Sequence, residues 1–433
     1  MPDRPRVVLG VGGGIAAYKA CELLRLFTET GHDVTVVPTA AALRFVGAAT
    51  WEALSGKPVS SDVFANVPEV QHVRLGRDAD LVVVAPATAD LLAKAAHGHA
   101  DDLLTSALLT ATCPVIFAPA MHTEMWEHPA TRNNVQTLRS RGSIVMEPAS
   151  GRLTGTDTGI GRLPEPAQIF EFTSNVLRSA AVRTSSDCEG DHCAAEASWG
   201  FTPVVSDLRG RVVISAGGTR EPLDPVRFLG NKSSGKQGFA LAAAAVARGA
   251  DVCLIAANVS LATPYGVAER YDVATTAQLH DAMMINVSGA RAVIMAAAPV
   301  DFRPATVMDH KIKKGPDRPA PSIDLVENPD ILVELVANRE RQALEQVLVG
   351  FAAETGDDEG TVLGHARAKL ARKGCDLLVV NDVSGGAVFG SDDNHAVLLG
   401  RDGSERALDP SSKIDLAHAI WDAVSALWSS RTR

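Results

Sequence analysis

Two glycine-rich turns constrain the fold of this chain more than any other feature. Each follows a short apolar run typical of a buried strand, Arg6–Gly10 in the first half and Arg211–Ser215 in the second. The first turn reads Gly-Val-Gly-Gly-Gly over residues 10–14, and the second reads Ala-Gly-Gly-Thr over residues 216–219. A helical pattern follows the first turn directly and the second after a polar excursion. Strand, glycine turn and helix begin a βα unit, so we predict two α/β sheets, one in each half.

The rest of the chain repeats this alternation with one interruption. Residues 183–199 are polar and carry no sustained apolar period, which indicates a linker. We predict a first domain over residues 1–182, a linker over 183–206 and a second domain over 207–433. The predicted fold class is α/β, with two open parallel-sheet domains, Rossmann-like or flavodoxin-like, joined by the polar linker. Further strands are expected at Asp33–Val37, Ala79–Val84, Val115–Ala118, Asp251–Ala256, Ala292–Ala297 and Leu377–Val380.

Composition argues against several classes of function. The net charge of −10 disfavours a general binder of nucleic acid or anionic membranes. No apolar run of the sequence is long enough to span a bilayer, and the start shows no signal-peptide pattern. The six cysteines are scattered, as expected of free thiols in a cytoplasmic protein. Cys188, His192 and Cys193 share the linker, but their spacing matches no common zinc pattern.

The first glycine turn suits an anion. Glycines between a strand and a helix N-terminus let backbone N–H groups approach a phosphate, and the helix dipole favours the negative charge. The turn lacks the full dinucleotide spacing, and the second strand ends in Pro38-Thr39 without an acidic residue, which favours a mononucleotide. On this motif alone, a simple tight turn without a ligand stays an alternative.

Sharper motifs follow in the first half. Gln71-His72 precedes Ala-Pro-Ala-Thr-Ala-Asp over residues 85–90 and Ala-Pro-Ala-Met-His-Thr-Glu-Met-Trp over residues 118–126. In order and spacing, residues 6–170 resemble the flavin-containing cysteine decarboxylases, specifically the phosphopantothenoylcysteine decarboxylases. The resemblance implies that His72 is the catalytic base, that His122 is a second catalytic residue, and that Met125, Trp126 and Arg162 contact the substrate. It implies FMN bound by Gly12, Gly13, Gly14, Ile15, Thr39, Pro86, Ala87, Thr88, Ala120 and Met121.

The resemblance also implies the chemistry. Flavin oxidises the thiol carbon to a thioaldehyde, and CO₂ leaves to give an enethiolate. Reduced flavin then returns the hydride to this intermediate, and an acid of the enzyme supplies a proton. Relatives carry Asn where this chain has His122, and an imidazole can also donate a hydrogen bond to a carboxylate. The lid segment 150–162 has Gly155 where many relatives have a proton-donating cysteine, so Thr154, Thr156, Asp157 and an ordered water stay open as the donor. Apart from the resemblance, this segment is a surface loop and His72 an ordinary histidine.

The second half carries an excursion rich in Gly, Ser, Thr and cations over residues 214–238. Such a segment can cradle phosphates through backbone N–H groups, although the P-loop spacing is absent. With Ala-Pro-Val-Asp over 298–301, Lys-Ile-Lys-Lys over 311–314 and Asn-Pro-Asp-Ile over 328–331, it resembles the phosphopantothenate–cysteine ligases over residues 207–425. Without the resemblance, residues 214–238 could be a long hairpin-like excursion, and residues 311–314 a run of solvated charges.

This second resemblance implies that CTP activates a carboxylate through an acyl-cytidylate, with Mg²⁺ on the triphosphate and metal ligands unknown. Lys311 would promote formation of the acyl-cytidylate, Asn231 would hold it, and Arg227 would anchor a nearby anionic group. The implied nucleotide pocket comprises Gly217, Gly218, Asp301, Lys311, Asn328, Pro329, Asp330, Ile331, Phe351, Lys369 and Lys373.

The implied partners are small molecules: 4′-phosphopantothenate, cysteine and CTP, with no nucleic acid and no membrane. Relatives form homo-oligomers with trimeric decarboxylase contacts and dimeric ligase contacts, so a dodecamer is a hypothesis. ATP in place of CTP stays open. Two other functions also stay open: a flavin-binding regulatory protein without turnover, and a nicotinamide-dependent oxidoreductase.

Overall fold

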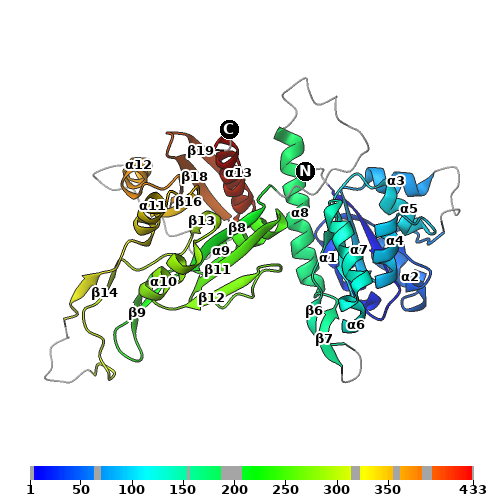
Figure 1. The fold of residues 1–433 in the computed structure, drawn as a ribbon, viewed down its shortest axis with the longest axis horizontal. Helices are drawn as coiled ribbons and strands as arrows, with labels where there is room; N and C mark the ends of the chain where they lie inside the picture. The colour runs from blue at the N-terminus through cyan, green and yellow to red at the C-terminus, as the bar shows by residue number, and fades with distance from the viewer. Residues whose placement is uncertain are drawn as a thin grey trace. The chain divides into compact units, whose positions relative to one another are not determined.

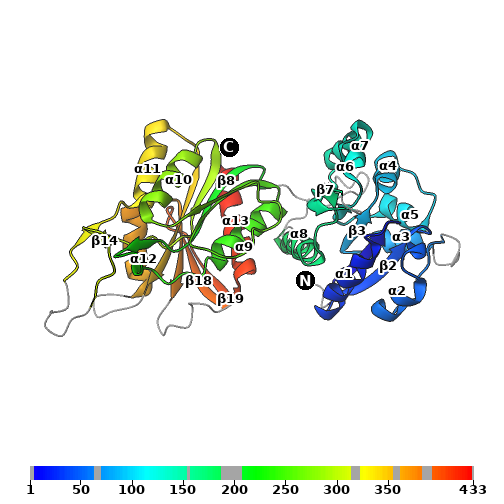
Figure 2. The same cartoon turned by 90° about the horizontal axis from the view of Figure 1, so that it is seen from below.

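The structure is a computed structural model that describes residues 4–62, 70–153, 157–186, 207–313, 322–354, 361–382 and 393–431. Contacts divide the chain into two compact units, Met1–Ser206 and Asp207–Arg433. Each unit layers helices on a central sheet, which confirms the α/β class (Figure 1, Figure 2). Helix α8 (Pro166–Ser186) continues past residue 182, the predicted end of the first domain. Cys188, His192 and Cys193 lie outside the described residues.

The first unit contains a five-stranded parallel sheet in the order β2-β1-β3-β4-β5. This is the flavodoxin-like order, in which the direction of winding reverses between β1 and β3. A two-stranded hairpin, β6–β7, follows the sheet. The elements are β1 (Arg6–Val11), α1 (Ala17–Glu29), β2 (Asp33–Pro38), η1 (Ala42–Arg44), α2 (Ala48–Ser55), α3 (Gln71–Asp78), β3 (Leu81–Ala87), α4 (Ala89–His97), α5 (Leu103–Thr110), β4 (Val115–Pro119), α6 (Thr123–Glu127), α7 (Pro129–Ser140), β5 (Ile144–Val145), β6 (Ala149–Arg152), β7 (Thr158–Arg162) and α8.

Apolar residues bury both faces of this sheet. All seven residues of β3 are buried, as a strand covered on both sides requires. On one face, Val82 and Val84 pack with apolar side chains of α4, α5 and α7. Helix α1 connects β1 to β2 and therefore covers the other face, because right-handed crossovers wind in opposite directions from the switch point. Helix α8 packs on α1 through an edge-to-face contact of Phe27 and Phe170, with ring centroids 5.2 Å apart.

The second unit contains an eight-stranded sheet in the order β12-β11-β8-β13-β16-β17-β18-β19. The first six strands are parallel, in the 3-2-1-4-5-6 order of a Rossmann fold. The elements are β8 (Gly210–Gly217), β9 (Arg220–Pro222), β10 (Phe228–Gly230), α9 (Lys236–Ala247), β11 (Ala250–Ala257), β12 (Glu269–Val273), α10 (Thr276–Asn286), β13 (Ala290–Met295), β14 (Phe302–Pro304), β15 (Leu325–Glu327), α11 (Ile331–Gln342), β16 (Val347–Glu354), α12 (Val362–Lys373), β17 (Leu377–Asp382), β18 (Asp393–Gly400), β19 (Glu405–Ser412) and α13 (Lys413–Arg431).

The predicted parallel sheet of the second unit carries an antiparallel edge that the sequence did not predict, because β18 and β19 run antiparallel. Only residues 383–392 separate β17 from β18. A parallel neighbour needs a crossover of about a dozen residues or more. The chain therefore returns alongside β17 in the opposite direction.

Alternation along β8 divides the second core into two layers. Val212 and Ile214 pack with α9 and α13 on one face, whereas Val213 packs with α10, α11 and α12 on the other. Trp421 of α13 is fully buried, and its Nε1 donates to the Leu241 carbonyl of α9 at 2.9 Å. The hairpin β9–β10 and the ribbon β14–β15 extend away from this sheet (Figure 1).

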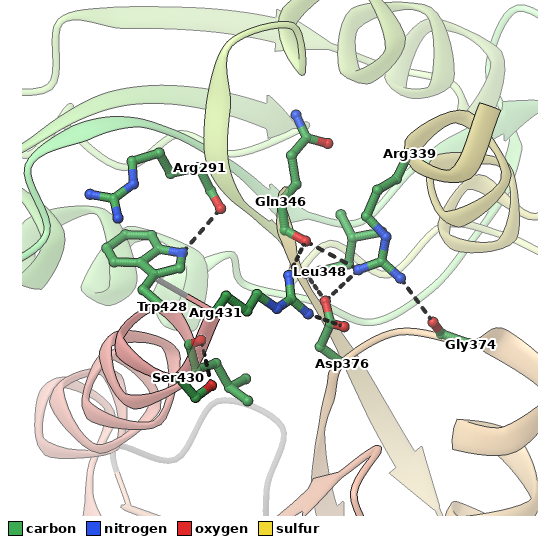
Figure 3. A network of polar contacts seen from close by, with 10 residues as sticks. Arg291, Arg339, Gln346, Leu348, Gly374, Asp376, Trp428, Ser430 and Arg431 are labelled. Carbon is green, nitrogen blue, oxygen red and sulfur yellow. Dashed lines mark hydrogen bonds and ion pairs between the residues drawn. The ribbon is translucent and has the colours of Figure 1, made fainter. Parts of the chain in front are cut away.

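A buried carboxylate joins four elements of the second unit (Figure 3). Asp376 precedes β17 and accepts hydrogen bonds from the guanidinium groups of Arg339 in α11 and Arg431 in α13. Its Oδ2 also accepts the backbone N–H of Leu348 in β16 at 2.7 Å. Both Arg339 and Asp376 are buried, so each charge depends on the other for compensation.

We expect Asp376→Ala to lower the free energy of unfolding of the second unit by about 3–5 kcal/mol, because it leaves buried guanidinium charge without a partner. Urea unfolding followed by circular dichroism measures the change. Asp281→Ala, which removes an exposed carboxylate, is the control and should change stability by about 0.5 kcal/mol or less. Equal effects of the two substitutions would contradict this assignment.

Candidate functional site

The first cavity lies at the carboxyl ends of β1–β4 and has a volume of about 760 Å³. Strand order reverses here, and the crevice at such a switch point is the usual ligand site of an open α/β sheet. The volume falls within the range of small-molecule and cofactor sites. Its lining brings together the predicted residues Gly13, Gly14, Ile15, Thr39, Pro86, Thr88, Ala120, Met121, His122, Met125 and Arg162.

Two glycines let the turns around this cavity touch. The Gly12 N–H donates to the Pro86 carbonyl at 3.0 Å, and a Cβ on Gly12 would lie 2.5 Å from that oxygen. A Cβ on Gly13 would lie 2.3 Å from Cβ of Ala41. Gly12 and the buried Ala87 thus do not line the cavity but lie beneath the residues that do.

Donors for an anionic or carbonyl ligand surround the glycine turn. Helix α1 begins beside the cavity without a side-chain cap, so its positive dipole end faces this region uncompensated. The Thr39 Oγ1 accepts the Ala42 N–H at 3.1 Å, and the Thr88 Oγ1 accepts the Leu91 N–H at 3.3 Å. Because these bonds use acceptor capacity only, each hydroxyl hydrogen can be donated to a ligand.

The hairpin β6–β7 fixes the segment after β4. The Met121 N–H donates to the Gly161 carbonyl at 2.9 Å, and the Thr123 Oγ1 donates to the Ile160 carbonyl at 2.7 Å. Gly161 has φ +143°, and a Cβ there would lie 2.2 Å from the Met121 carbonyl oxygen. His122, between these anchors, is the N-cap residue of α6 and lines the cavity.

Trp126, which the resemblance implies as a substrate contact, does not line the first cavity of its own chain. Its side chain is 7% exposed and packs in the core with Phe117 and Val135. Met125, one residue earlier, is 48% exposed and lines the cavity. On a helix, consecutive residues face different directions, so only one of the two can face the cavity.

An ion-pair cluster that the sequence did not predict lies in this cavity. The Lys94 Nζ lies 2.9 Å from a carboxylate oxygen of Asp101 and 3.5 Å from one of Asp90. The hydrogen bond with Asp101 raises the pKa of Lys94 and lowers that of Asp101. The spacing of Asp90 and Lys94, one helical turn apart, was the signal for this pair. Arg162 pairs with Glu165, which also accepts from Lys19.

His72 does not line the first cavity of its own chain. It lies in α3, and its backbone carbonyl accepts the hydroxyl of Thr110 at the far end of α5. Helix α5 begins at the cavity rim beside Asp102 and spans eight residues, or roughly 12 Å. The segment with Thr154, Gly155 and Thr156 lies outside the described residues.

The second cavity lies at the switch point between β8 and β13 and has a volume of about 1040 Å³. It is bounded by the segment before α9, the segment after β13, the N-terminus of α11 and residues of α12. The predicted residues in its lining are Asn231, Asp301, Asn328, Pro329, Asp330, Ile331, Phe351, Lys369 and Lys373.

Gly217 and Gly218 support the second cavity without lining it. Gly217 has φ +88°, and a Cβ there would lie 2.1 Å from the Ala257 carbonyl oxygen. A Cβ on Gly218 would lie 2.9 Å from the Asn231 carbonyl oxygen. The Asn231 Nδ2 donates to the Pro299 carbonyl at 2.8 Å, which ties the two walls together.

Basic side chains dominate the second cavity. Among the described residues, six cations line it against three carboxylates, Asp301, Glu327 and Asp330. Asp330 caps α11 and pairs with Lys373. Two of the six cations, Lys369 and Lys373, are predicted site residues. The other four lie on α9, α12, α13 and the segment before α9: Lys232, Lys236, Arg372 and Lys413.

Asn328 holds the loop that carries Asp301. The Asn328 N–H donates to the Asp301 carbonyl and its Nδ2 donates to the Val300 carbonyl, each at 2.8 Å. Arg303 Nη1 donates to the Asn328 Oδ1 at 3.1 Å. The side-chain amide is therefore used for positioning, whereas Ile331 and Phe351 supply apolar lining.

Arg227 and Lys311 lie together but outside the second cavity. The Arg227 Nη2 donates to the Ile312 carbonyl at 2.9 Å, and the Ile312 N–H donates to Asp224 at 3.1 Å. Burial opposes charge on Asp224, but backbone donors from Val226, Ile312 and Arg227 lower its pKa. Both predicted residues thus belong to the extension formed by β9–β10 and β14–β15. Lys314 lies outside the described residues.

No helix in the described part of the chain is long and apolar enough to cross a membrane. Within the described ranges, no group of three or more His, Cys, Asp or Glu side chains is arranged to hold a metal ion.

Comparison with known proteins matches both units. Residues 1–178 match the flavoprotein family, and residues 208–427 match the DNA/pantothenate metabolism flavoprotein C-terminal domain. Three relatives are named coenzyme A biosynthesis bifunctional protein CoaBC. That of Mycolicibacterium smegmatis is 55% identical over 435 residues, with all of both chains covered. That of Mycobacterium tuberculosis is 56% identical, covering 97% of this chain and 96% of the relative. That of Bacillus subtilis is 42% identical, covering 99% and 98%. The chain belongs to the family of bifunctional coenzyme A biosynthesis proteins, with a flavoprotein unit followed by a pantothenate-metabolism unit.

Proposed function

We propose that the second unit joins 4′-phosphopantothenate to cysteine with CTP, and that the first unit decarboxylates the product with FMN to give 4′-phosphopantetheine. The observation that carries the proposal is the presence of two cavities of different chemistry at two switch points of one chain. One combines a glycine cradle with hydroxyl donors, and the other concentrates cations. The buried free thiols Cys113, Cys253 and Cys375 suit a cytoplasmic location.

The first cavity fits a flavin mononucleotide. Bound FMN supplies a two-electron acceptor that ends each turnover in its starting oxidation state. The glycine turn and Thr39 would hold the phosphate and ribityl oxygens, because they present the donors near the dipole end of α1. His122 would donate a hydrogen bond to the substrate carboxylate, and Met125 would cover the apolar part of the substrate.

His72 would act in the first cavity of another copy of the chain. The buried atoms Gln71 Oε1 and His72 Nδ1 have no hydrogen-bond partner in the described structure. Beside them, Val70 is 48% exposed and Leu109 is 56% exposed. Buried polar atoms without partners next to exposed apolar side chains suit a subunit interface. A trimer would let each imidazole complete a neighbouring site.

The second cavity fits a nucleoside triphosphate with Mg²⁺. Lys369 and Lys373 would bind the phosphates, and Mg²⁺ would arrive with them. Asp301, residues 328–331 and Phe351 would hold the nucleoside, and Asn231 the acyl-cytidylate. Lys311 and Arg227 would reach the reacting groups of a second subunit. The extension that carries them exposes Val226, Phe228, Phe302, Val307, Met308 and Leu325, which suits a dimer contact. Trimeric and dimeric contacts together would give a dodecamer.

The test of this function uses the purified chain with 4′-phosphopantothenate, cysteine, CTP and Mg²⁺, with CMP and CO₂ followed separately. We expect both products, and a yellow protein that releases FMN on denaturation. Replacing CTP with ATP tests the nucleotide preference. A protein that binds flavin but releases neither product would support the regulatory alternative, and bound nicotinamide in place of FMN would support the oxidoreductase alternative.

We expect His72→Asn to retain FMN and ligase activity but to lower the rate of CO₂ release by about 100-fold or more, since the general base is lost. CO₂ release from phosphopantothenoylcysteine and CMP release from the coupled reaction give the two readouts. Full decarboxylase activity in this variant would remove His72 from the mechanism.

Mixed oligomers test whether the base acts between subunits. Gly13→Val should abolish FMN retention, because the added side chain clashes with Ala41. Neither Gly13→Val nor His72→Asn alone should decarboxylate well. Co-expressed, the two chains can pair an intact flavin site with an intact imidazole, so CO₂ release should partly return. No recovery in verified mixed oligomers would mean that His72 serves its own chain. Gly47→Ala, where a Cβ meets open space, is the control for glycine substitution.

We expect Lys311→Gln to slow pyrophosphate release by about 100-fold, because one positive charge that stabilises the transition state is lost. Decarboxylation of supplied phosphopantothenoylcysteine should not change. Arg406→Gln removes an exposed charge of the same sign from β19, outside the cavity, and should leave both reactions unaffected. Unchanged pyrophosphate release in Lys311→Gln would refute the role.

A further inference from the structure

His122 is exceptional among the titratable side chains of the first cavity. Within the described residues, it is the one such side chain with no hydrogen bond or ion pair. Its ring does not cap α6 even though it occupies the N-cap position. An imidazole is the side chain that most readily gives and takes a proton near neutral pH.

The other titratable groups in the lining are committed to partners. Lys94 is paired with both Asp90 and Asp101. Asp102 caps α5, where it accepts the backbone N–H and the hydroxyl of Thr105, each at 2.7 Å. Arg162 is paired with Glu165, and a guanidinium does not release its proton in a protein. Proton transfer by Lys94 or the three carboxylates would require these interactions to break first.

The backbone around His122 is fixed on both sides. The bond from Met121 to Gly161 precedes it, and the bond from Thr123 to Ile160 follows it. The His122 carbonyl also accepts the N–H groups of Met125 and Trp126, each at 3.0 Å, in the first turn of α6. These bonds fix the backbone that carries the ring beside the cavity, and positioning of this kind favours proton donation.

We propose that His122, as the imidazolium, delivers the proton that replaces the departing carboxylate; the proposal rests on the decarboxylase function proposed above. The ring N–H that would bind the carboxylate would lie next to the carbon from which neutral CO₂ departs. The electron pair of the broken C–C bond forms the C=C bond of the enethiolate. The electron pair of the C=C bond then forms a C–H bond between that carbon and the His122 proton. At the same time, an electron pair on sulfur forms the C=S bond again. FMN bound in the cavity would supply the hydride that gives the thiolate, and solvent would reprotonate the ring, so no external oxidant or reductant would be consumed.

His122→Asn separates binding of the carboxylate from proton delivery, because an amide donates a hydrogen bond but has no proton to give. With phosphopantothenoylcysteine, we expect the variant to release CO₂ in the first turnover. Steady-state turnover should fall by about 100-fold or more. The bound product should be the ethenethiol, which lacks two hydrogens relative to 4′-phosphopantetheine, and the flavin should stay bleached. Glu127→Gln, an exposed change on the same helix, is the control.

A readout independent of turnover checks the site itself. Flavin-free His122→Asn should bind FMN with wild-type affinity in a fluorescence titration, because the substitution leaves the glycine cradle intact. Imidazole in solution should restore steady-state turnover to His122→Ala, which a folding defect would not allow.

Three results would overturn the proposal: wild-type steady-state turnover in His122→Asn, absence of CO₂ in its first turnover, or failure of imidazole to rescue His122→Ala. Absence of CO₂ release from the wild-type protein would instead reject the proposed decarboxylase function.

Discussion

Direct contact between backbone turns at the two switch points is the constraint on which both sites depend. At the first, the Gly12 N–H donates to the Pro86 carbonyl, and at the second, the Ala298 N–H donates to the Gly217 carbonyl. These contacts set how far apart the strand ends lie, and therefore how wide each cavity is. The residues that line the cavities lie on turns whose separation these contacts fix. The same backbone contacts therefore determine both the arrangement of the strand ends and the positions of the ligand-binding residues.

The two cavities solve different electrostatic problems on a chain of net charge −10. The first balances Lys94 against Asp90 and Asp101, so its charged groups largely neutralise one another. The second gathers six cations against three carboxylates from segments spread over almost 200 residues. The sheet topology brings these cations together, because the carboxyl ends of parallel strands lie at the same edge of the sheet. Net charge therefore describes the outer surface and says little about either site.

The strand–turn–helix pattern predicted most of the fold. Every strand expected from an apolar run has a counterpart in the structure, because strands buried on both faces are rich in apolar residues. The central strand β16 was not among the strands expected, although its residues Val347–Val349 are fully buried. The antiparallel edge could not be predicted from the apolar runs, because a buried strand has the same apolar sequence pattern whether it runs parallel or antiparallel to its neighbour. Motifs pointed to Thr39, Thr88 and Asn328, and all three line the cavities. The same motifs could not separate Trp126, which faces the core, from its neighbour Met125, since that choice depends on helix phase. Lys413 was not predicted because α13, at the end of the chain, reaches the cavity only in the folded unit.

Gly12, Gly13 and Gly217 lie where even a methyl group collides with another turn. Every missense change that a single nucleotide can make in a glycine codon introduces at least that methyl group. Single-nucleotide substitutions at these glycines should therefore not be tolerated during evolution toward another specificity. A change of specificity has to come from the side chains on the surrounding loops, while the close backbone contacts at the glycines are conserved.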